Sequence, residues 1–486
     1  MSDIAKPRLQ LLSDEQCARI HEGALRIMGE VGLRITTPEA RELLAGAGAQ
    51  LIDDEDLMTI PAKAVEDALN SAPGEVTMFD REGEPALRLG DGSGPYFAAG
   101  VTNLQYIPPG ERDPRDFTLQ DFADIATLAD ALPNIDYIAT PGVVRPNKDV
   151  HVDVMNQNET YQLMTNSRLP LLVLIPEAFA LQDVFEMAAV IRGGRAEFEA
   201  KPFVSPYLNP VSPLLFNPET IDKLFMAVDW HTPVVCQAAP QLGGSSPVTV
   251  AGSITQAAAE SLTGLVLSQL RRPGAAFITG VVPFEMEMRT GNVIATGPDM
   301  SLFHMGYGQL TQWWGLPALG VGGGGDAKIV DEQAVMELAY YMGTMFWSGM
   351  DMTFDVGCLD CGLAFSPELL ALGDEMISIY RGIFAGFDVS EDALAVDVVK
   401  EVGPGGFFLG NEHTLGLFRE LWAPSLLAWE PRNMWEERGG TTLRERAATQ
   451  VADILASHEV PPLPQDVLDG MRAIIDARAA LIEPDD

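Results

Sequence analysis

Glycine and acidic residues gather in the stretch "GVGGGGDAKIVDEQA", which runs from Gly320 to Ala334. Four consecutive glycines precede its first carboxylate: Gly322, Gly323, Gly324 and Gly325. Because glycine loses more backbone entropy on folding than any other residue, such a run indicates a tight turn or a ligand that approaches the backbone closely. Asp326 is a candidate for a catalytic or a structural carboxylate. Asp331 is better explained as the N-cap of a following helix.

Aromatic side chains form a second group of candidates. The faces of Trp, Tyr and Phe bind quaternary ammonium groups with about 0.5–2 kcal/mol each. Aromatic residues near predicted element ends or in the C-terminal loop include Tyr96, Phe97, Tyr207, Trp313, Trp314, Trp347, Phe407, Phe408 and Trp422. Core packing explains most of them equally well, so this pattern alone does not establish a cation site.

Signatures of hydrolytic and metal-dependent catalysis are absent from the sequence. It contains neither H-E-x-x-H nor G-x-S-x-G, and its six histidines are scattered. Cys358 and Cys361 form a CxxC, but a zinc site would need further ligands and no second CxxC exists. We therefore expect no metal here and interpret the two thiols as small buried side chains.

A repeated pattern between Gly94 and Asp388 predicts how these residues are positioned. Eight times, an apolar run that ends in Gly, Pro or Asn is followed by an amphipathic helix. Continuous apolar strands that alternate with helices indicate a parallel sheet, and eight such units match an α/β fold, the closed (β/α)8 TIM barrel. An open, doubly wound sheet is the alternative, but no G-x-G-x-x-G or Walker pattern follows the first strand.

The active site of such a barrel lies at the carboxyl ends of its strands. The pattern places these residues there: Thr102, Asn103, Pro141, Gly142, Tyr207, Asn209, Gln237, Gln241, Gly280, Pro283, 322–326 and 357–360. The glycine run would then end the seventh strand, beside the site.

The segments on either side of the barrel differ from it. Residues 1–92 read as an N-terminal cap of helices and one hairpin, with Ser13 and Gln16 in the spacing of a capping box. Residues 93–388 form the predicted barrel. Residues 389–486 are rich in Gly, Trp and Phe before two helical stretches, and read as a C-terminal helical extension packed on the barrel.

The overall charge argues against several partners. The chain has 486 residues and a formal charge of −38, from 69 acidic and 31 basic side chains. Nucleic acid and anionic membranes both need a positive surface, so neither is expected. The charge suits solubility and is compatible with a cationic ligand. Four cysteines and no apolar signal core or spanning segment indicate a cytoplasmic protein.

Four segments resemble the trimethylamine methyltransferase family: "IHEGALRIMGEVGLRI", "GVGGGGDAKIVDEQAVME", "LDCGLAFSPELLALGDEM" and "GPGGFFLGNEHT". The resemblance covers nearly the whole chain. It implies a (β/α)8 barrel that moves a methyl group from a methylated amine to the cobalt of a separate corrinoid protein. The cobalamin would arrive on that partner, with no permanently bound cofactor. We also expect a homo-oligomer.

The founding members of this family carry pyrrolysine near the seventh strand, and this sequence contains only ordinary residues. It therefore resembles the non-pyrrolysine branch, which demethylates quaternary amines such as glycine betaine. Cys361 stands where the family usually has glycine, which further disfavours a metal role for the CxxC. A quaternary amine leaves as a neutral tertiary amine, so the reaction needs no acid.

The enzyme must align nitrogen, methyl and cobalt and strip water from the cation. Since the charge on nitrogen falls during transfer, too strong a cation site would favour the ground state. We therefore expect aromatics and amide dipoles rather than a close carboxylate pair.

This interpretation assigns roles to particular residues. The glycine run would clear space for the approaching cobalamin, the alternative being a tight turn only. Asp326 is the catalytic candidate. The substrate-binding candidates are Tyr96, Phe97, Tyr207, Asn209, Gln237, Arg289, Trp313, Phe407 and His413. Arg289 and His413 lead as donors to a substrate carboxylate, with Arg145 and His304 behind them.

Three alternatives stay open at this stage. The chain could use another betaine, a sulfonium donor or another methyl acceptor. It could bind a betaine or a corrinoid without catalysis. It could also be an unrelated barrel lyase or decarboxylase, which should need a metal or a basic anion pocket.

Overall fold

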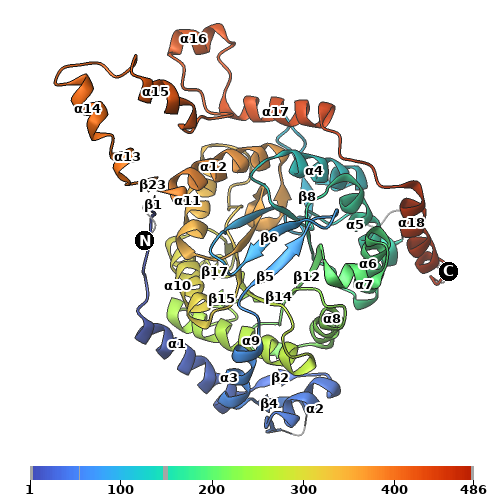
Figure 1. Cartoon of the computed structure of the whole chain (residues 1–486). Helices are drawn as coiled ribbons and strands as arrows, with labels where there is room; N and C mark the ends of the chain where they lie inside the picture. Colours follow the sequence, from blue (N-terminus) through green and yellow to red (C-terminus); the bar gives the residue numbers. More distant parts are fainter. Residues whose placement is uncertain (1–3, 54, 146–150, 483–486) are drawn as a thin grey trace.

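Eight parallel strands close into a barrel in the computed structural model of this protein, in which residues 4–53, 55–145 and 151–482 are described (Figure 1). In barrel order they are β7 (Tyr96–Ala99), β10 (Tyr137–Ala139), β11 (Leu171–Val173), β12 (Val204–Leu208), β14 (Val234–Ala238), β16 (Phe277–Val281), β19 (Ala318–Val321) and β20 (Met352–Val356). β20 pairs in parallel with β7 and closes the barrel. The predicted fold class is thus confirmed.

A helix follows each strand and covers the outside of the barrel. These helices are α4 (Leu119–Ala131), α5 (Met155–Asn166), α6 (Ala178–Arg192), α8 (Pro218–Asp229), α9 (Val250–Arg271), α10 (Pro298–Trp314), α11 (Glu332–Ser348) and α12 (Pro367–Ala385). A short helix, α7 (Arg195–Ala200), follows α6. Asp331 accepts hydrogen bonds from the amides of Gln333 and Ala334, so its prediction as an N-cap is confirmed.

The chain before the barrel covers one side and one end of it. Its helices α1 (Asp14–Arg26), α2 (Pro38–Gly46) and α3 (Ala62–Ser71) pack against α9. Ser13 and Gln16 form the predicted capping box. A small sheet joins β2 (Leu33–Ile35), β3 (Gln50–Leu51) and β4 (Leu57–Thr59) to β13 (Leu215–Phe216).

The predicted hairpin is also present, as β5 (Val76–Phe79) and β6 (Pro85–Leu89). It lies across the amino ends of the barrel strands (Figure 1). The Phe79 amide donates to the carbonyl of Pro202, two residues before β12, and the Gly90 amide donates to the carboxylate of Asp351, just before β20. The carboxyl ends of the strands are therefore left for the site.

Two small sheets surround the carboxyl ends of the strands. One contains β15 (Gln241–Leu242), β17 (Phe284–Met286) and β18 (Val293–Ile294). The other contains β8 (Gln105–Tyr106), β9 (Arg115–Asp116), β21 (Cys358–Leu359) and β22 (Ala364–Phe365). Both come from loops that follow barrel strands, so they hold these loops in place around the barrel mouth.

The C-terminal region has two parts. After β23 (Phe387–Asp388), which pairs with β1 (Ile4–Ala5), most of residues 389–440 project away from the barrel, while Trp422, Ser425 and Leu427 hydrogen-bond to Ser378 and Glu375 of α12 (Figure 1). We call them the arm; it carries α13 (Glu391–Leu394), α14 (Val396–Val402), α15 (Glu412–Leu417) and α16 (Arg432–Glu437). The last helices, α17 (Leu443–Ser457) and α18 (Gln465–Ala479), pack on α12 and α6 respectively. Within the described residues, no helix is both long and apolar enough to cross a membrane.

Candidate active site

A cavity of about 280 Å³ lies at the carboxyl ends of the barrel strands. Strand ends contribute Tyr207, Asn209, Ala239, Val282, Val321, Phe354 and Asp355 to its walls, and Phe284 and Ala295 come from the small sheet beside it. The site is therefore where the barrel predicts it. None of the described lining residues is Arg, Lys or His, so the cavity has an acidic and aromatic character.

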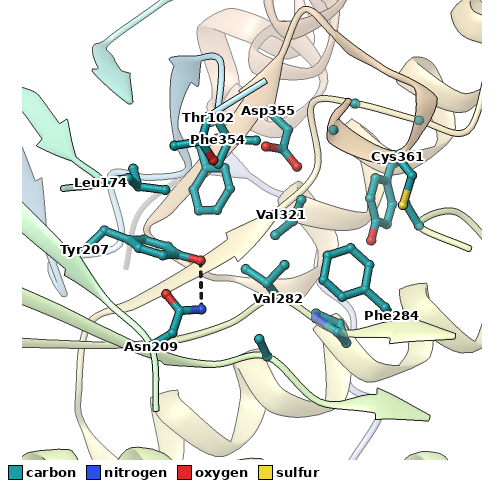
Figure 2. Close-up of a pocket in the computed structure, with 18 residues that line it drawn as sticks. Thr102, Leu174, Tyr207, Asn209, Val282, Phe284, Val321, Phe354, Asp355 and Cys361 are labelled. Carbon is teal, nitrogen blue, oxygen red and sulfur yellow. Dashed lines mark hydrogen bonds between the residues drawn. The ribbon is translucent and has the colours of Figure 1, made fainter. Parts of the chain in front are cut away.

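Asp355 is the one carboxylate among the described lining residues. Residues 352 and 354 of β20 face the barrel interior, so regular alternation would turn residue 355 outwards. The register of β20 against β7 shifts between Thr353 and Val356, and Asp355 has φ of +77°. This bulge re-aims the side chain, and Figure 2 shows the carboxylate pointing into the cavity. A non-glycine residue in the left-handed region is strained, and such strain is concentrated at functional sites.

No basic side chain of the described chain forms an ion pair with Asp355. Burial raises the pKa of its carboxyl well above the ordinary value, with no nearby positive charge to oppose the shift. The thiol of Cys358 lies 4.0 Å from Oδ1 and is only a weak donor. Asp355 thus lacks a counter-charge, which a cationic ligand would supply.

Aromatic rings surround this carboxylate. Tyr207 and Phe354 pack edge to face, with ring centroids 5.7 Å apart and planes at 77°. Phe284 lies on the other side of the cavity, with Val321 and Val282 between (Figure 2). Tyr341 of α11 also lines the wall. Aromatic rings beside one carboxylate are a combination that can recognise a quaternary ammonium group.

Tyr207 and Asn209 were both predicted to contact substrate, and the structure brings them together in the cavity. Asn209 Nδ2 donates to the Tyr207 hydroxyl oxygen at 3.2 Å (Figure 2). The backbone carbonyl of Asn209 accepts from the hydroxyl of Thr220 at 2.7 Å. Burial raises the pKa of the Tyr207 hydroxyl, so the phenol stays neutral and available as a hydrogen-bond donor.

The glycine run follows β19 and packs tightly against neighbouring backbone and side chains. A Cβ on Gly323 would overlap the amide nitrogen of Val356, directly after Asp355. A Cβ on Gly324 would lie 2.9 Å from the Cβ of Cys358, and one on Gly322 would overlap Met345. Only Gly324 and Gly325 also line the cavity. The run thus lets the end of β19 lie against the bulge that aims Asp355, and much of the space it clears is filled by the chain itself.

Asp326 does not line the cavity but holds part of its wall. Its carboxylate accepts from the amides of Ala295 and Thr296, at 3.0 and 2.9 Å, and from the Thr296 hydroxyl at 2.6 Å. Ala295 is itself a lining residue. The structure therefore gives Asp326 a positioning role, fastening the strand that ends at Ile294 to the loop after β19.

Three predicted residues on barrel strands lie away from the cavity lining. Tyr96 begins β7 at the opposite end of the barrel, where its hydroxyl contacts Ser93 at 2.8 Å. Phe97 is fully buried and packs on Phe346 of α11. Gln237 is fully buried in β14, and neither its Nε2 nor its Oε1 has a hydrogen-bond partner among the described residues. It precedes the lining residue Ala239 by two positions, so it shares the face that points into the barrel.

The other predicted substrate contacts are further away. Arg289 is 90% exposed and pairs with Glu287 at 3.0 Å. Trp313 lies on α10 beside His21 of the N-terminal cap. Phe407 and His413 are on the arm, where Phe407 is 79% exposed. The structure brings none of these four to the cavity.

The remaining basic candidates also stay outside. Arg145 pairs with Asp116 at 3.3 Å. His304 is buried between the carbonyl of Met300 and the amide of Val321, and burial lowers its pKa to about 4. It is therefore neutral and cannot supply a positive charge.

The CxxC residues have separate environments. Cys358 is buried and its thiol donates to Asn103 Oδ1 at 3.1 Å. Cys361 lines the cavity, with φ of +55°, and burial raises its pKa to about 12. Both groups are protonated thiols, and neither belongs to the one acidic cluster with metal-ligand spacing found among the described residues, Asp53, Glu55 and Asp56.

The profile of the family described as trimethylamine methyltransferase (MTTB) matches residues 3–483. The chain belongs to the trimethylamine methyltransferase family. It is 27% identical over 464 residues to trimethylamine methyltransferase MttB of Desulfitobacterium hafniense, covering 96% of this chain and 93% of that protein. It is also 27% identical over 474 residues to a glycine betaine methyltransferase of D. hafniense, covering 97% and 98%. The protein is therefore a methyltransferase, as the sequence predicted.

A solved structure carries the same fold. The monomethylamine methyltransferase MtmB of Methanosarcina barkeri aligns with a TM-score of 0.52 at 13% identity, over 98% of this chain and 96% of that one. The cavity of this family member thus lies on a barrel of the same fold as that of a methylamine enzyme. Sequence reasoning missed Asp355, Phe354, Phe284 and Tyr341. The sequence does contain one indication of Asp355, because this charged residue lies inside the apolar run "MTFDVG".

Proposed function

We propose that this methyltransferase transfers a methyl group from a quaternary ammonium compound to the Co(I) of a corrinoid carried by a separate protein. Glycine betaine is the first candidate for the donor. Asp355 carries this proposal, because a carboxylate without an ion-pair partner, held among aromatic rings at the barrel mouth, is a group with which a permanent cation would pair.

The lining suits removal of a methyl group without acid catalysis. A quaternary nitrogen leaves as a neutral tertiary amine, so the electron pair of the broken C–N bond stays on nitrogen and no proton is needed. The apolar side chains of Val282, Val321 and Leu174 exclude water from the cation. A single carboxylate balances its charge, and the rings of Tyr207 and Phe354 share that role. Because only one carboxylate faces the cation, the ground state is not stabilised too strongly relative to the transition state, in which the positive charge on nitrogen disappears.

The small residues of the lining fit the delivery of a corrinoid by a partner. Ala295, Gly324, Gly325 and Gly362 present no side chain beyond Cβ to the cavity. The corrinoid would supply the electron pair that accepts the methyl group. The residues of this chain would hold the cation in line, since positioning supplies most of the rate in such transfers. We further propose a cytoplasmic location, in keeping with four free cysteines.

Turnover tests the proposal directly. Glycine betaine, carnitine, proline betaine and trimethylamine are each incubated with the protein and free cob(I)alamin, and methylcobalamin is followed by absorbance. We expect methylation with at least one quaternary amine and none with trimethylamine. Dimethylsulfoniopropionate tests the sulfonium alternative, because a sulfonium is also a permanent cation. Turnover of trimethylamine alone would contradict the proposal.

A second function, binding without catalysis, predicts a different result. Betaine would raise the melting temperature of the protein, while no methylcobalamin would form with either free cob(I)alamin or a corrinoid protein. Methyl transfer seen only with the corrinoid protein would instead support the proposal and show that the partner is required.

A further inference from the structure

A second lobe extends the cavity beyond Tyr207 and Asn209. It has a volume of about 280 Å³ and shares four lining residues with the first lobe, Thr102, Leu174, Tyr207 and Asn209. Figure 2 shows these four on the side of the cavity away from Phe284. The two lobes therefore adjoin at these four residues, with Asp355 in the first lobe and a different set of polar groups in the second.

The second lobe contains the cation that the first one lacks. Lys223 of α8 lines it and is 7% exposed, and its Nζ donates to the carbonyl of Ile175 at 2.8 Å. Among the described residues that line either lobe, Lys223 is the only Arg, Lys or His. Burying an ammonium group is costly unless a partner offsets the lost solvation. The present partner is Glu219, at 3.1 Å, whose side chain is 50% exposed.

Two further features make this lobe suitable for an anion. The first turn of α8 lines it through Asn217, Glu219 and Thr220, so the positive end of a twelve-residue helix dipole faces the space. Thr220 is tied to the backbone of Asn209 by its hydroxyl, which fixes α8 against the boundary between the lobes. Glu219 is the half-exposed member of this pair, so its carboxylate can turn towards solvent when an incoming carboxylate takes its place beside Lys223.

We propose that the physiological donor is an extended betaine, with its quaternary nitrogen at Asp355 and its carboxylate in the second lobe at Lys223. This inference rests on the proposed function and departs from it in the donor alone, because it favours a longer betaine over glycine betaine. In glycine betaine a single carbon separates nitrogen from the carboxylate, so the carboxylate would stay near Asp355, where like charges repel and no described cation lies. A donor with three or more intervening carbons holds its carboxylate further from its nitrogen, so the two charges can lie in different lobes.

Calorimetric binding of three probes tests this inference. The probes are 4-(trimethylammonio)butanoate, its uncharged-tail analogue n-butyltrimethylammonium, and glycine betaine. The Kd of the butanoate should be at least about tenfold lower than that of either other probe, since a desolvated charge pair discriminates by this order. Equal affinity for the first two probes, or tighter binding of glycine betaine, would overturn the inference.

Matched variants assign the effect to Lys223. In Lys223→Gln the ratio of the Kd of n-butyltrimethylammonium to the Kd of the butanoate should fall to about one. Lys328→Gln removes an equally charged but 67% exposed lysine that lines neither lobe, and should keep the ratio. Glu219→Gln removes the competing carboxylate and should increase the ratio. An unchanged ratio in Lys223→Gln, with a melting temperature close to that of the unmodified protein, would overturn the assignment. If Lys223→Gln fails to fold, two other measurements test the inference. They are the Kd ratio in Glu219→Gln and the binding of the three probes to the unmodified protein.

Turnover measured in parallel separates this inference from the function on which it rests. Methyl transfer to cob(I)alamin without preference for the butanoate would overturn only the extended-donor inference. Preferential binding of the butanoate with no methyl transfer, even to a corrinoid protein, would overturn only the transfer.

Discussion

Asp355 combines three properties: a positive φ, a half-buried carboxyl whose pKa is raised, and no counter-ion in the described chain. Each of these costs folding free energy. The cost persists because the bulge in β20 is held from both sides, by β7 and by the glycine run. At the residue scale, the site is thus a destabilised carboxylate that a cationic ligand stabilises.

Asp355→Asn should separate stability from function. Asparagine keeps the shape of the side chain and tolerates positive φ, so the bulge should survive. Removing an unpaired buried charge should raise the melting temperature. The loss of the charge should lower kcat/KM for the quaternary amine by about 30-fold or more, because removing one member of a buried charge pair costs about 2–5 kcal/mol. Calorimetric melting and the cobalamin assay check the two expectations. A variant that melts earlier and keeps full activity would contradict this role.

The affinity for a quaternary cation should increase with pH. The pKa of Asp355 is raised in the folded protein, so at low pH the carboxyl is protonated and must release its proton to pair with the cation. Affinity should therefore rise until the pH exceeds that raised pKa and then level off. Tyr207, Tyr341 and Cys361 face the same space, but their pKa values are raised further into the alkaline range and they stay neutral. Binding measured across pH, with Asp355→Asn giving a flat profile, checks this.

At the scale of elements, β19 and β20 act as one unit. The glycines after β19 let its backbone approach Val356, and this contact supports the bulge that turns Asp355 inwards. Asp326 extends the unit by holding Ala295 and Thr296, which join the neighbouring small sheet to the same loop. The cavity wall thus depends on backbone packing at a strand end as much as on its side chains.

Gly323→Ala should disturb the site through this contact. The added methyl group would overlap the Val356 amide nitrogen, which belongs to backbone and cannot rotate away. We expect a loss of about 1–3 kcal/mol in the free energy of unfolding and a clear drop in activity, as for other overpacked sites. Gly46→Ala is the control, since nothing lies within 4 Å of its added Cβ. Denaturant unfolding compares the two; equal stability would argue against the supporting role of the run.

At the scale of the whole molecule, the arm is unlike the rest of the chain. Its apolar side chains are exposed: Phe407 is 79%, Leu421 74% and Leu409 68% accessible. Apolar side chains gathered on one surface segment mark an interaction site. The arm leaves the barrel at the pairing of β23 with β1 and does not cover the cavity lining. Its apolar surface is consistent with the expected homo-oligomer.

We expect the protein to form an assembly in which the arm contacts a second copy of the chain. Light scattering after size exclusion should give a mass at least twice that of one chain. Replacing Phe407, Leu409 and Leu421 together by serine should shift this mass towards the monomer, because the contact loses most of its apolar area. The unmodified protein eluting as a monomer would contradict the expectation, and would leave the corrinoid protein as the partner to test on this surface.

The barrel, the family and the capped helix starts could all be predicted from the order of the residues. Apolar runs alternating with amphipathic helices carry that information locally, and so do capping residues such as Ser13, Gln16 and Asp331. Spacing also led to Tyr207 and Asn209, because both lie directly at a regular strand end. The same reasoning also selected Phe407 and His413, which lie on the arm and not at the cavity. A local sequence pattern does not predict the path of a long connection in space.

Only the tertiary structure decided the position of Asp355 and the use of the glycine run. A bulge reverses the direction of a side chain, and it forms here because β7, β20 and the residues after β19 meet in space, although β7 lies more than 200 residues from the other two in the chain. The placement of Asp355 and Lys223 in neighbouring lobes is of the same kind. Strand alternation predicts neither, because both depend on which backbone segments come into contact when the barrel closes.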